Sequence, residues 1–342
     1  MDPIDLQSND YYFNLRAHFG YYEPMYRDYH GMNIWREVVS YNPTKFRDKV
    51  VFEVGTGPGL FALLAARAGA RHVYTWEPSI IATSAIDVIK KNNYQDTITV
   101  LQGPIDKIKL NEKVDLVFTT SIGYCLLLDS LIPELLFARD NFLKEGGTVI
   151  PSSAEIYLSS CIESSYDYIT KYNWSDVYGF DFSPIEKDET NEACLDCIAY
   201  SRIKTDSVLI CNLDFTKITV NDLSIISPFT LRSCNDEPFT IDRFILWFKL
   251  KFPIPENKPE NDQQQIELST SPYDADTHWY QVSIRIPQEY QENNDNLINK
   301  DDTINGTISI LHKDNKLRPI MIRIQYSDNL KEPSKIINAV FK

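Results

Sequence analysis

The segment from Lys49 to Gly69 constrains the fold more than any other part of this 342-residue chain. Its first residues, KVVFEV, form a short apolar run that predicts a buried strand ending in an acid, Glu53. The next residues, GTGPG, contain Gly55, Gly57 and Gly59, and LFALLAARAGA then predicts a strong helix. Glycines between a strand and a helix let a ligand approach the backbone amides at the positive end of that helix. The segment therefore predicts a strand, a ligand-binding turn and a helix in succession.

A second predicted strand, HVYTW at His72–Trp76, is followed directly by an acid, Glu77. An acid in this position is placed to accept hydrogen bonds from the diol of a ribose. The glycine spacing is GxGxG, which differs from the GxGxxG of dinucleotide sites. The strand–loop–helix–strand unit therefore predicts a nucleoside site of the S-adenosylmethionine type. The alternative is a turn that needs glycine for its backbone alone.

Predicted strands continue to alternate with helices as far as Pro151. Ile98–Leu101 and Val114–Phe118 are apolar runs, and TVIP predicts another strand after a turn formed by a pair of glycines. This alternation predicts an α/β domain at 47–150. The composition changes after Pro151, which we take as the boundary of the domain.

The stretch from Val114 to Leu143 is predicted to contain the reacting centre. Its strand is followed by a turn, Thr119 to Tyr124, and then by a long helical pattern. The apolar face of that pattern consists of Leu127, Leu131, Leu135 and Phe142. Chemistry in an open parallel sheet takes place beyond the carboxyl ends of the strands, so we expect the turn to lie at the site. Asp129 is the only carboxylate between Leu116 and Ile132, so strong acids and bases are scarce there.

The remaining chain, 151–342, contains short runs of β-branched and aromatic residues between turn signals. This pattern predicts an antiparallel β-barrel or sandwich. A helical, aromatic-rich insert at about 166–187 interrupts the pattern and needs a surface against which to bury its apolar side chains. Its candidate interface residues are Trp174, Tyr178, Phe180 and Phe182. The first 46 residues are also aromatic-rich, and we predict that they form a helical lid ahead of the glycine loop.

Composition argues against several classes of function. The net charge of −14 argues against nucleic-acid binding through a basic face and is compatible with a basic peptide or protein as partner. The six cysteines include one CxxC without a second pair at metal-ligand spacing, so we expect reduced thiols and no metal site. No apolar run approaches the roughly 20 residues of a membrane helix, and no secretion signal is recognised. We therefore expect a cytoplasmic protein that does not bind a membrane.

Several long segments carry a family resemblance. They are DYYFNLRAHFG, EPMYRDY, VVFEVGTGPGLFALLAARAGA, VYTWEPS, VDLVF, GYCLLLDSLIPELLFARDNFLKEGG, WSDVYGFDFS and THWYQ at Thr277–Gln281. In this order they resemble the lid, the first two methyltransferase motifs, the substrate loop, the dimerisation arm and the closing loop of the type I protein arginine N-methyltransferase family. The resemblance covers essentially the whole chain. It implies a Rossmann-like domain, then a β-barrel whose arm docks on a partner's Rossmann-like domain.

The substrate loop departs from the family pattern at two positions. In an active member, two glutamates grip the guanidinium group of the substrate, which stays charged at any working pH. The first glutamate falls on Thr120, which carries no charge, and the second falls on Asp129, which is one methylene shorter. A misplacement of about 1 Å can reduce a rate by about a hundredfold.

The cofactor side departs as well. The lid arginine of the family falls on His30, its lid tyrosine falls on Arg16, and Pro58 removes one backbone donor from the glycine loop. The positions Glu53, Gly55, Gly57, Gly59, Glu77, Asp28 and His278 are kept. We expect Asp28 and His278 to pair and so to link the lid to the closing loop.

These departures favour a catalytically inactive regulatory subunit that resembles a prozyme. Such a chain would activate a catalytic arginine methyltransferase paralogue in a hetero-dimer or hetero-tetramer, would not be an enzyme by itself and would bind no cofactor tightly. One alternative is a divergent, active S-adenosylmethionine-dependent protein arginine N-methyltransferase that uses Asp129, with Glu53 or Asp28. A second alternative is an acidic scaffold that binds arginine-rich proteins.

Overall fold

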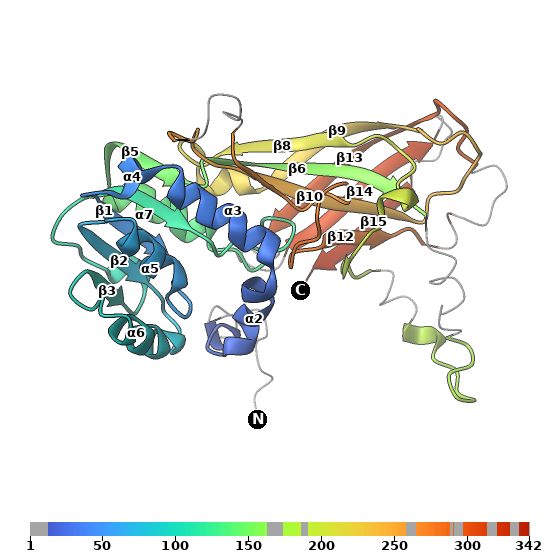
Figure 1. Cartoon of the computed structure of the whole chain (residues 1–342). Helices are drawn as coiled ribbons and strands as arrows, with labels where there is room; N and C mark the ends of the chain where they lie inside the picture. The colour runs from blue at the N-terminus through green and yellow to red at the C-terminus, as the bar shows by residue number, and fades with distance from the viewer. Residues whose placement is uncertain are drawn as a thin grey trace. The chain divides into compact units, whose positions relative to one another are not determined.

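The computed structural model describes residues 13–162, 174–185, 191–257, 265–287, 290, 297–312, 320–328 and 335–341. The chain divides into two compact units (Figure 1). Unit 1 consists of Met1–Ala154, Leu213–Asp222 and Lys249–Ser269. Unit 2 consists of Glu155–Asn212, Leu223–Phe248 and Thr270–Lys342.

Unit 1 is built on a five-stranded parallel sheet in the order β3-β2-β1-β4-β5. Its strands are β1 (Val50–Val54), β2 (His72–Trp76), β3 (Ile98–Leu101), β4 (Val114–Thr119) and β5 (Leu143–Ile150). All five residues of β1 are buried, as expected for the central strand of a parallel sheet with both faces covered.

Helices precede β1 and connect strands of the sheet (Figure 1). They include α2 (Phe19–Arg27), α3 (Tyr29–Ser40) and α4 (Pro43–Phe46) before β1, and α5 (Leu60–Arg67), α6 (Ile81–Lys91) and α7 (Ile132–Phe142) between strands. Helix α5 follows the glycine loop and begins after Gly59, whose φ of 97° is in the left-handed region that favours glycine. The α3 and α5 helices meet through Trp35, whose ring contacts the ring of Phe61 at 5.8 Å between centroids.

The strand order reverses between β1 and β4. β1 pairs with β2 on one side and with β4 on the other, so the connections leave β1 in opposite directions. In such sheets a ligand binds beyond the carboxyl ends of the strands at the reversal. The carboxyl ends of β1, β2 and β4 therefore define where a functional site is to be sought.

The predicted long helix after Tyr124 is wrong in its first part, because α7 begins only at Ile132. Cys125, Leu126 and Asp129 have φ angles of 47°, 70° and 56°, which no helix allows. The segment instead folds back on itself, and the amide of Leu128 donates to the carbonyl of Tyr124 at 3.0 Å. The glycine pair at 146 and 147 was expected to be a turn before a strand, but both residues lie inside β5.

The remaining strands form two further sheets. The strands are β6 (Ser153–Cys161), β7 (Cys194–Asp196), β8 (Val208–Asp214), β9 (Ile225–Arg232), β10 (Arg243–Lys251), β11 (Glu267–Ser269), β12 (Gln281–Arg285), β13 (Thr303–His312), β14 (Ile320–Asp328) and β15 (Lys335–Phe341). One sheet has the order β7-β12-β10-β6-β8, with β11 paired to β10 in unit 1, and the other has the order β15-β14-β13-β9. The second sheet is antiparallel throughout. The predicted fold class, a Rossmann-like domain followed by antiparallel β structure, is confirmed.

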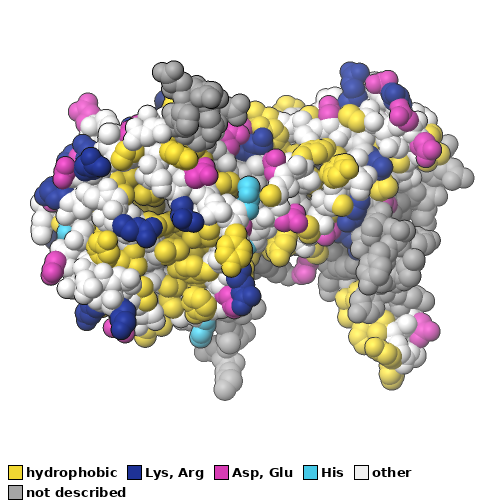
Figure 2. Space-filling view, in the orientation of Figure 1, with side chains coloured by type: hydrophobic (Ala, Val, Ile, Leu, Met, Phe, Trp, Pro, Cys, Tyr) yellow, Lys and Arg dark blue, Asp and Glu magenta, His cyan; other side chains and the backbone are white. Residues whose placement is uncertain are grey.

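Several large apolar side chains lie exposed on unit 1. They are Phe19, Tyr29, Ile80 and Val88, on or beside α2, α3 and α6. Figure 2 shows hydrophobic side chains gathered over the part of the molecule where α2, α5 and α6 lie in Figure 1.

None of the helices in the described part of the chain is both long and apolar enough to cross a membrane.

Candidate functional site

The glycine loop turns sharply at the end of β1. Gly55 and Gly57 both have positive φ, at 80° and 50°. A Cβ at Gly57 would lie 2.5 Å from a ring carbon of Tyr22, so only glycine allows this close approach of the lid helix α2. The amides of Gly55 and Thr56 both donate to the carbonyl of Trp76, which ties the loop to the end of β2.

Glu77 lies at the end of β2 and is completely buried. One of its oxygens accepts a hydrogen bond from the amide of Gly57 at 3.0 Å, and the other accepts from the amide of Ser79 at 3.1 Å. The carboxylate is thus held beside the glycine loop by backbone donors. This is the position predicted for the acid that binds a ribose.

Glu53 is the second buried acid of the site. One oxygen accepts hydrogen bonds from the hydroxyl groups of Thr56, at 2.7 Å, and Thr75, at 2.5 Å. Its other oxygen is buried and has no hydrogen-bond partner among the described residues. Burial, opposed by the two hydroxyl hydrogen bonds and reinforced by the charge of Glu77, raises the pKa of Glu53 to about 7. A group of this kind exchanges a proton near neutral pH.

The N-terminal segment covers the glycine loop through Arg16 and helix α2. The guanidinium of Arg16 lies 3.6 Å from the carboxylate of Glu77 and donates to the hydroxyl of Ser121 at 2.9 Å. Tyr22, which is 5% exposed, lies against Gly57. These contacts place Arg16 and α2 against the glycine loop, and the lid itself stays a prediction.

Two further aromatic residues complete this cover. Tyr26 of α2 is half-buried and forms a hydrogen bond with the backbone of Leu60, the first residue of α5. Burial, reinforced by the charge of Glu53, raises the pKa of Tyr26. Phe13 meets Trp76 edge to face with ring centroids 6.2 Å apart, whereas Tyr12 lies outside the described residues.

The loop after β4 holds the two positions predicted to contact a substrate. Thr120 is 4% exposed and Asp129 is half-buried. Gly123 is required here, since a Cβ would lie 1.7 Å from the carbonyl oxygen of Leu128. Cys125, Leu126 and Asp129 of the same loop have positive φ, and backbone strain of this kind is typical of functional loops, in which surrounding contacts hold an unfavourable conformation.

The other sequence-predicted residues are described within their own units. Asp28 caps α3 by accepting from the amide of Gly31 at 2.7 Å. His30 is exposed on α3, and Pro58 is half-buried in the glycine loop. His278, in unit 2, lies against Trp279 with ring centroids 3.7 Å apart. The pairing of Asp28 with His278 stays a prediction.

The described part of the insert, 174–185, is a tight turn with exposed aromatic side chains. Val177 and Phe180 form a β-bridge, and the amide of Phe182 donates to the carbonyl of Trp174 at 2.6 Å. The exposed fractions are 97% for Tyr178, 69% for Phe180 and 39% for Phe182. The rest of the predicted insert, 166–173 and 186–187, lies outside the described residues.

The sequence interpretation did not identify several polar residues of the site. Thr56 and Thr75 hold Glu53, Ser79 holds Glu77, and Ser121 holds Arg16. Thr56, Ser79 and Ser121 stand within four residues of the ends of β1, β2 and β4, which is the one sequence signal that would have located them.

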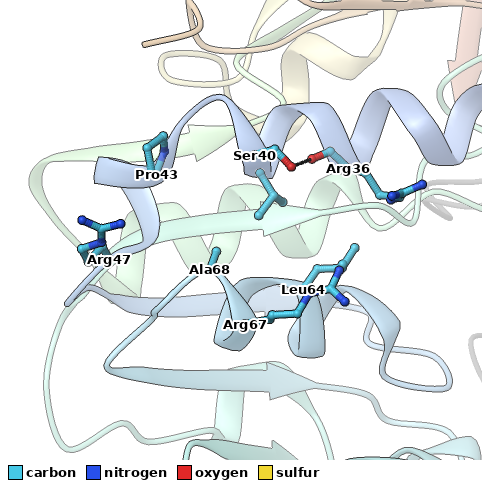
Figure 3. Close-up of a pocket in the computed structure, with 8 residues that line it drawn as sticks. Arg36, Ser40, Pro43, Arg47, Leu64, Arg67 and Ala68 are labelled. Atoms are coloured by element: carbon cyan, nitrogen blue, oxygen red, sulfur yellow. Dashed lines mark hydrogen bonds between the residues drawn. The ribbon is translucent and has the colours of Figure 1, made fainter. Parts of the chain in front are cut away.

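A separate basic hollow lies at the other end of α5. It has a volume of about 330 Å³ and is lined by Arg36 of α3, Arg47 at the end of α4 and Arg67 of α5 (Figure 3). The hydroxyl of Ser40 donates to the carbonyl of Arg36 within its wall. None of the predicted site residues lines it, so it is not part of the glycine-loop site.

Comparison with known proteins identifies the kind of chain to which this site belongs. The model of the arginine methyltransferase oligomerization subdomain matches 152–331, and that of ribosomal protein L11 methyltransferase (PrmA) matches 39–158. Protein arginine N-methyltransferase 1 of Schizosaccharomyces pombe is 34% identical over 331 residues, covering 96% of this chain and 93% of the relative. Protein arginine N-methyltransferase 1.1 of Arabidopsis thaliana is 34% identical over 326 residues, covering 95% and 80%.

Solved structures agree with this comparison. The Trypanosoma brucei PRMT1 enzyme–prozyme heterotetrameric complex with AdoHcy superposes with a TM-score of 0.85 at 26% identity, covering 96% of this chain and 100% of the other. Arabidopsis thaliana protein arginine methyltransferase 10 superposes with a TM-score of 0.79 at 23% identity, covering 96% and 99%, which shows a shared fold.

These matches correct one expectation. The departures at Thr120 and Asp129 in the substrate loop, and at His30, Arg16 and Pro58 on the cofactor side, predict a chain that is not an enzyme by itself. Relatives 31–34% identical along nearly the whole chain are named as protein arginine N-methyltransferases, which contradicts that expectation. The error came from treating these few side chains as decisive against the whole chain. The family prediction is confirmed, and on these matches the chain belongs to the protein arginine N-methyltransferase family.

Proposed function

We propose that this chain is an S-adenosylmethionine-dependent protein arginine N-methyltransferase that works in an oligomer. The observation that carries the proposal is the buried carboxylate of Glu77, held against the amide of Gly57 at the carboxyl edge of a parallel sheet. A nucleoside cofactor is bound in this way at such an edge. The near-full-length similarity to arginine methyltransferases supports methyl transfer to arginine as the reaction at this edge.

The residues of the glycine-loop site are of the types that would bind S-adenosylmethionine. Glu77 is the acceptor for the two ribose hydroxyls, and the glycines let the ligand come close to the backbone of the loop. The N-terminus of α5 faces this loop with its positive dipole end, which suits the carboxylate of a methionyl group. When bound, S-adenosylmethionine supplies an electrophilic methyl group on a positively charged sulfur.

Asp129 is the residue that we assign to the substrate guanidinium. A guanidinium is charged at any working pH, so it needs a carboxylate beside it in a closed site. Asp129 is the acid of the loop after β4, while Thr120 offers only a neutral hydroxyl. A carboxylate in this place orients the guanidinium nitrogen and accepts the proton that the nitrogen loses on methylation.

We propose further that the active form is a hetero-oligomer with a second arginine methyltransferase chain. Support comes from the exposed aromatic side chains at 178–182, the exposed apolar surface of α2, α3 and α6, and the match to an oligomerization subdomain. The T. brucei structure is itself an enzyme–prozyme heterotetramer. An apolar turn of one chain docked on the apolar helices of another removes both surfaces from water.

The test is methyl transfer from S-adenosylmethionine to an arginine-rich peptide by the purified chain, alone and with a candidate paralogue. We expect transfer by the wild-type protein together with the paralogue, and a rate lower by at least about a hundredfold when Asp129→Ala takes its place. The matched control is Asp140→Ala, because Asp140 is an exposed aspartate of α7 outside the loop. Equal rates for the wild-type protein and Asp129→Ala would contradict the assignment of Asp129 to the substrate guanidinium.

A further inference from the structure

The guanidinium of Arg16 occupies the point at which three strand ends of unit 1 meet. Its Nη2 atom lies 3.6 Å from Glu77 after β2 and 2.9 Å from the hydroxyl of Ser121 after β4. A Cβ built on Gly55, after β1, would lie 3.1 Å from the same nitrogen. The group therefore fills the crevice at the reversal of strand order, where a nucleoside binds in a sheet of this topology.

The surroundings of Arg16 combine several groups that hold a guanidinium. The side chain is 1% exposed, and the rings of Tyr21 and Tyr22 lie 5.4 and 5.5 Å from its central carbon. A carboxylate, a hydroxyl and two aromatic faces are the groups that hold a guanidinium best. The backbone carbonyl of Arg16 also accepts from the hydroxyl of Ser79 at 3.3 Å, so the backbone is fixed along with the side chain.

The guanidinium of Arg16 lies beside the carboxylate of Glu77. One oxygen accepts from the amide of Gly57 and lies 3.6 Å from Nη2 of Arg16, and the other accepts from the amide of Ser79. Each carboxylate oxygen has a second acceptor position that a ribose hydroxyl can use. A ribose diol in the crevice would need the space that the guanidinium of Arg16 fills, so it reaches these positions only when the guanidinium moves away.

We propose that Arg16 is an intramolecular latch that competes with the nucleoside cofactor for Glu77, so that the chain binds S-adenosylmethionine only after its N-terminal segment opens. The inference rests on the proposed function for the identity of the ligand. Its physical consequence is an apparent affinity reduced by the fraction of molecules in which the latch is open. Contact with another chain that draws the lid away from the loop would raise that affinity.

The first test is calorimetric titration of the full chain with S-adenosylhomocysteine. We expect Arg16→Ala and Arg16→Gln to bind this probe about tenfold or more tightly than the wild-type protein. Arg27→Ala is the matched control, because Arg27 lies exposed on α2 and pairs with Glu23 four residues before it. We expect the control to bind like the wild-type protein. Unchanged or weaker binding by folded Arg16→Ala and Arg16→Gln would overturn the latch.

A second test uses the wild-type protein and does not depend on a variant that folds. Trypsin cleaves after accessible arginines, and Arg16 is 1% exposed. We expect S-adenosylhomocysteine to accelerate cleavage after Arg16 several-fold, while cleavage after Arg27 stays the same. Cleavage after Arg16 that is slowed or unaffected at saturating probe would contradict the latch. Failure of the proposed function is distinguishable, since it would appear as absent methyl transfer by a chain that binds the probe.

Discussion

Nη2 of Arg16 lies 3.6 Å from Oε2 of Glu77, and the two side chains are 1% and 0% exposed. Because two opposite charges are buried together, each compensates for the lost hydration of the other. Arg16 stands where the family resemblance placed a lid tyrosine, so this contact is a feature of the chain's own sequence.

The first prediction concerns the coupling of this pair. Arg16→Ala and Glu77→Ala should each lower the free energy of unfolding by about 3 to 5 kcal/mol, since each leaves a buried charge without its partner. The double variant should be less destabilised than the sum of the two, and urea denaturation of all four proteins measures the difference. Strict additivity would mean that the two side chains do not interact.

The second prediction concerns the close approach of Tyr22 to the glycine loop. Gly57→Ala brings a Cβ to 2.5 Å from the ring of Tyr22, whereas Gly103→Ala meets no atom within 4 Å. Both glycines have positive φ, so both variants carry a backbone penalty of about 1 to 2 kcal/mol. Gly57→Ala should lose about 1 to 3 kcal/mol more in the same denaturation experiment. Equal losses would show that Tyr22 does not pack on the loop.

The third prediction concerns the pH dependence of stability that arises from Glu53. Its pKa is raised from 4.5 to about 7 in the folded protein, so the folded state holds more protons than the unfolded state between these values. The contribution of Glu53 to stability is therefore present below pH 4.5 and is lost as the pH rises to about 7, by up to roughly 3 kcal/mol.

Glu53→Gln removes this titration and isolates it from that of other groups. The stability of the wild-type protein minus that of the variant should fall as the pH rises from 4.5 to about 7. The measurement is the free energy of unfolding of both proteins across that range. A difference that stays constant with pH would contradict the raised pKa of Glu53 in the folded protein.

The fourth prediction concerns the exposed aromatic turn. Tyr178→Ala and Phe180→Ala should each raise the dissociation constant of the proposed hetero-oligomer with a second arginine methyltransferase chain about tenfold or more. Aromatic side chains contribute much of the binding energy of most interfaces. Analytical ultracentrifugation measures that constant. Tyr200→Ala is the matched control, since Tyr200 is 68% exposed but lies outside the turn. If the Tyr200 variant dissociates as readily as the others, the turn is not the interface.

Local sequence patterns were enough to predict the glycine loop and the position of Glu77. The strand before the loop, the glycines and the helix after it are contiguous, so their order fixes their geometry. The acid after β2 followed from the same strand–helix–strand unit. The fold class was predictable for a related reason, because β6, β8, β9, β10, β12, β13 and β14 each carry a clear run of strand-forming residues.

Contacts between distant segments were not predictable. Arg16 was treated as a lost lid tyrosine, and its pairing with Glu77 depends on how α2 packs on the loop. The segment before α7 has an apolar periodicity that suits a helix, but the positive φ angles of Cys125, Leu126 and Asp129 reflect tertiary contacts that periodicity does not contain. The three-residue strands β7 and β11 are too short to give a pattern, and β15 was missed.

The most direct measurement is mass spectrometry of an arginine-rich peptide incubated with the purified chain and S-adenosylmethionine, alone and together with a candidate paralogue. Glu77→Ala serves as the variant without the ribose acceptor. The account predicts methylated arginine in the reaction that contains the wild-type chain together with the paralogue, and at least about tenfold less with Glu77→Ala in place of the wild-type chain. Absence of methylated arginine from the reaction of the folded wild-type chain with the paralogue, or equal yields with Glu77→Ala, would contradict it.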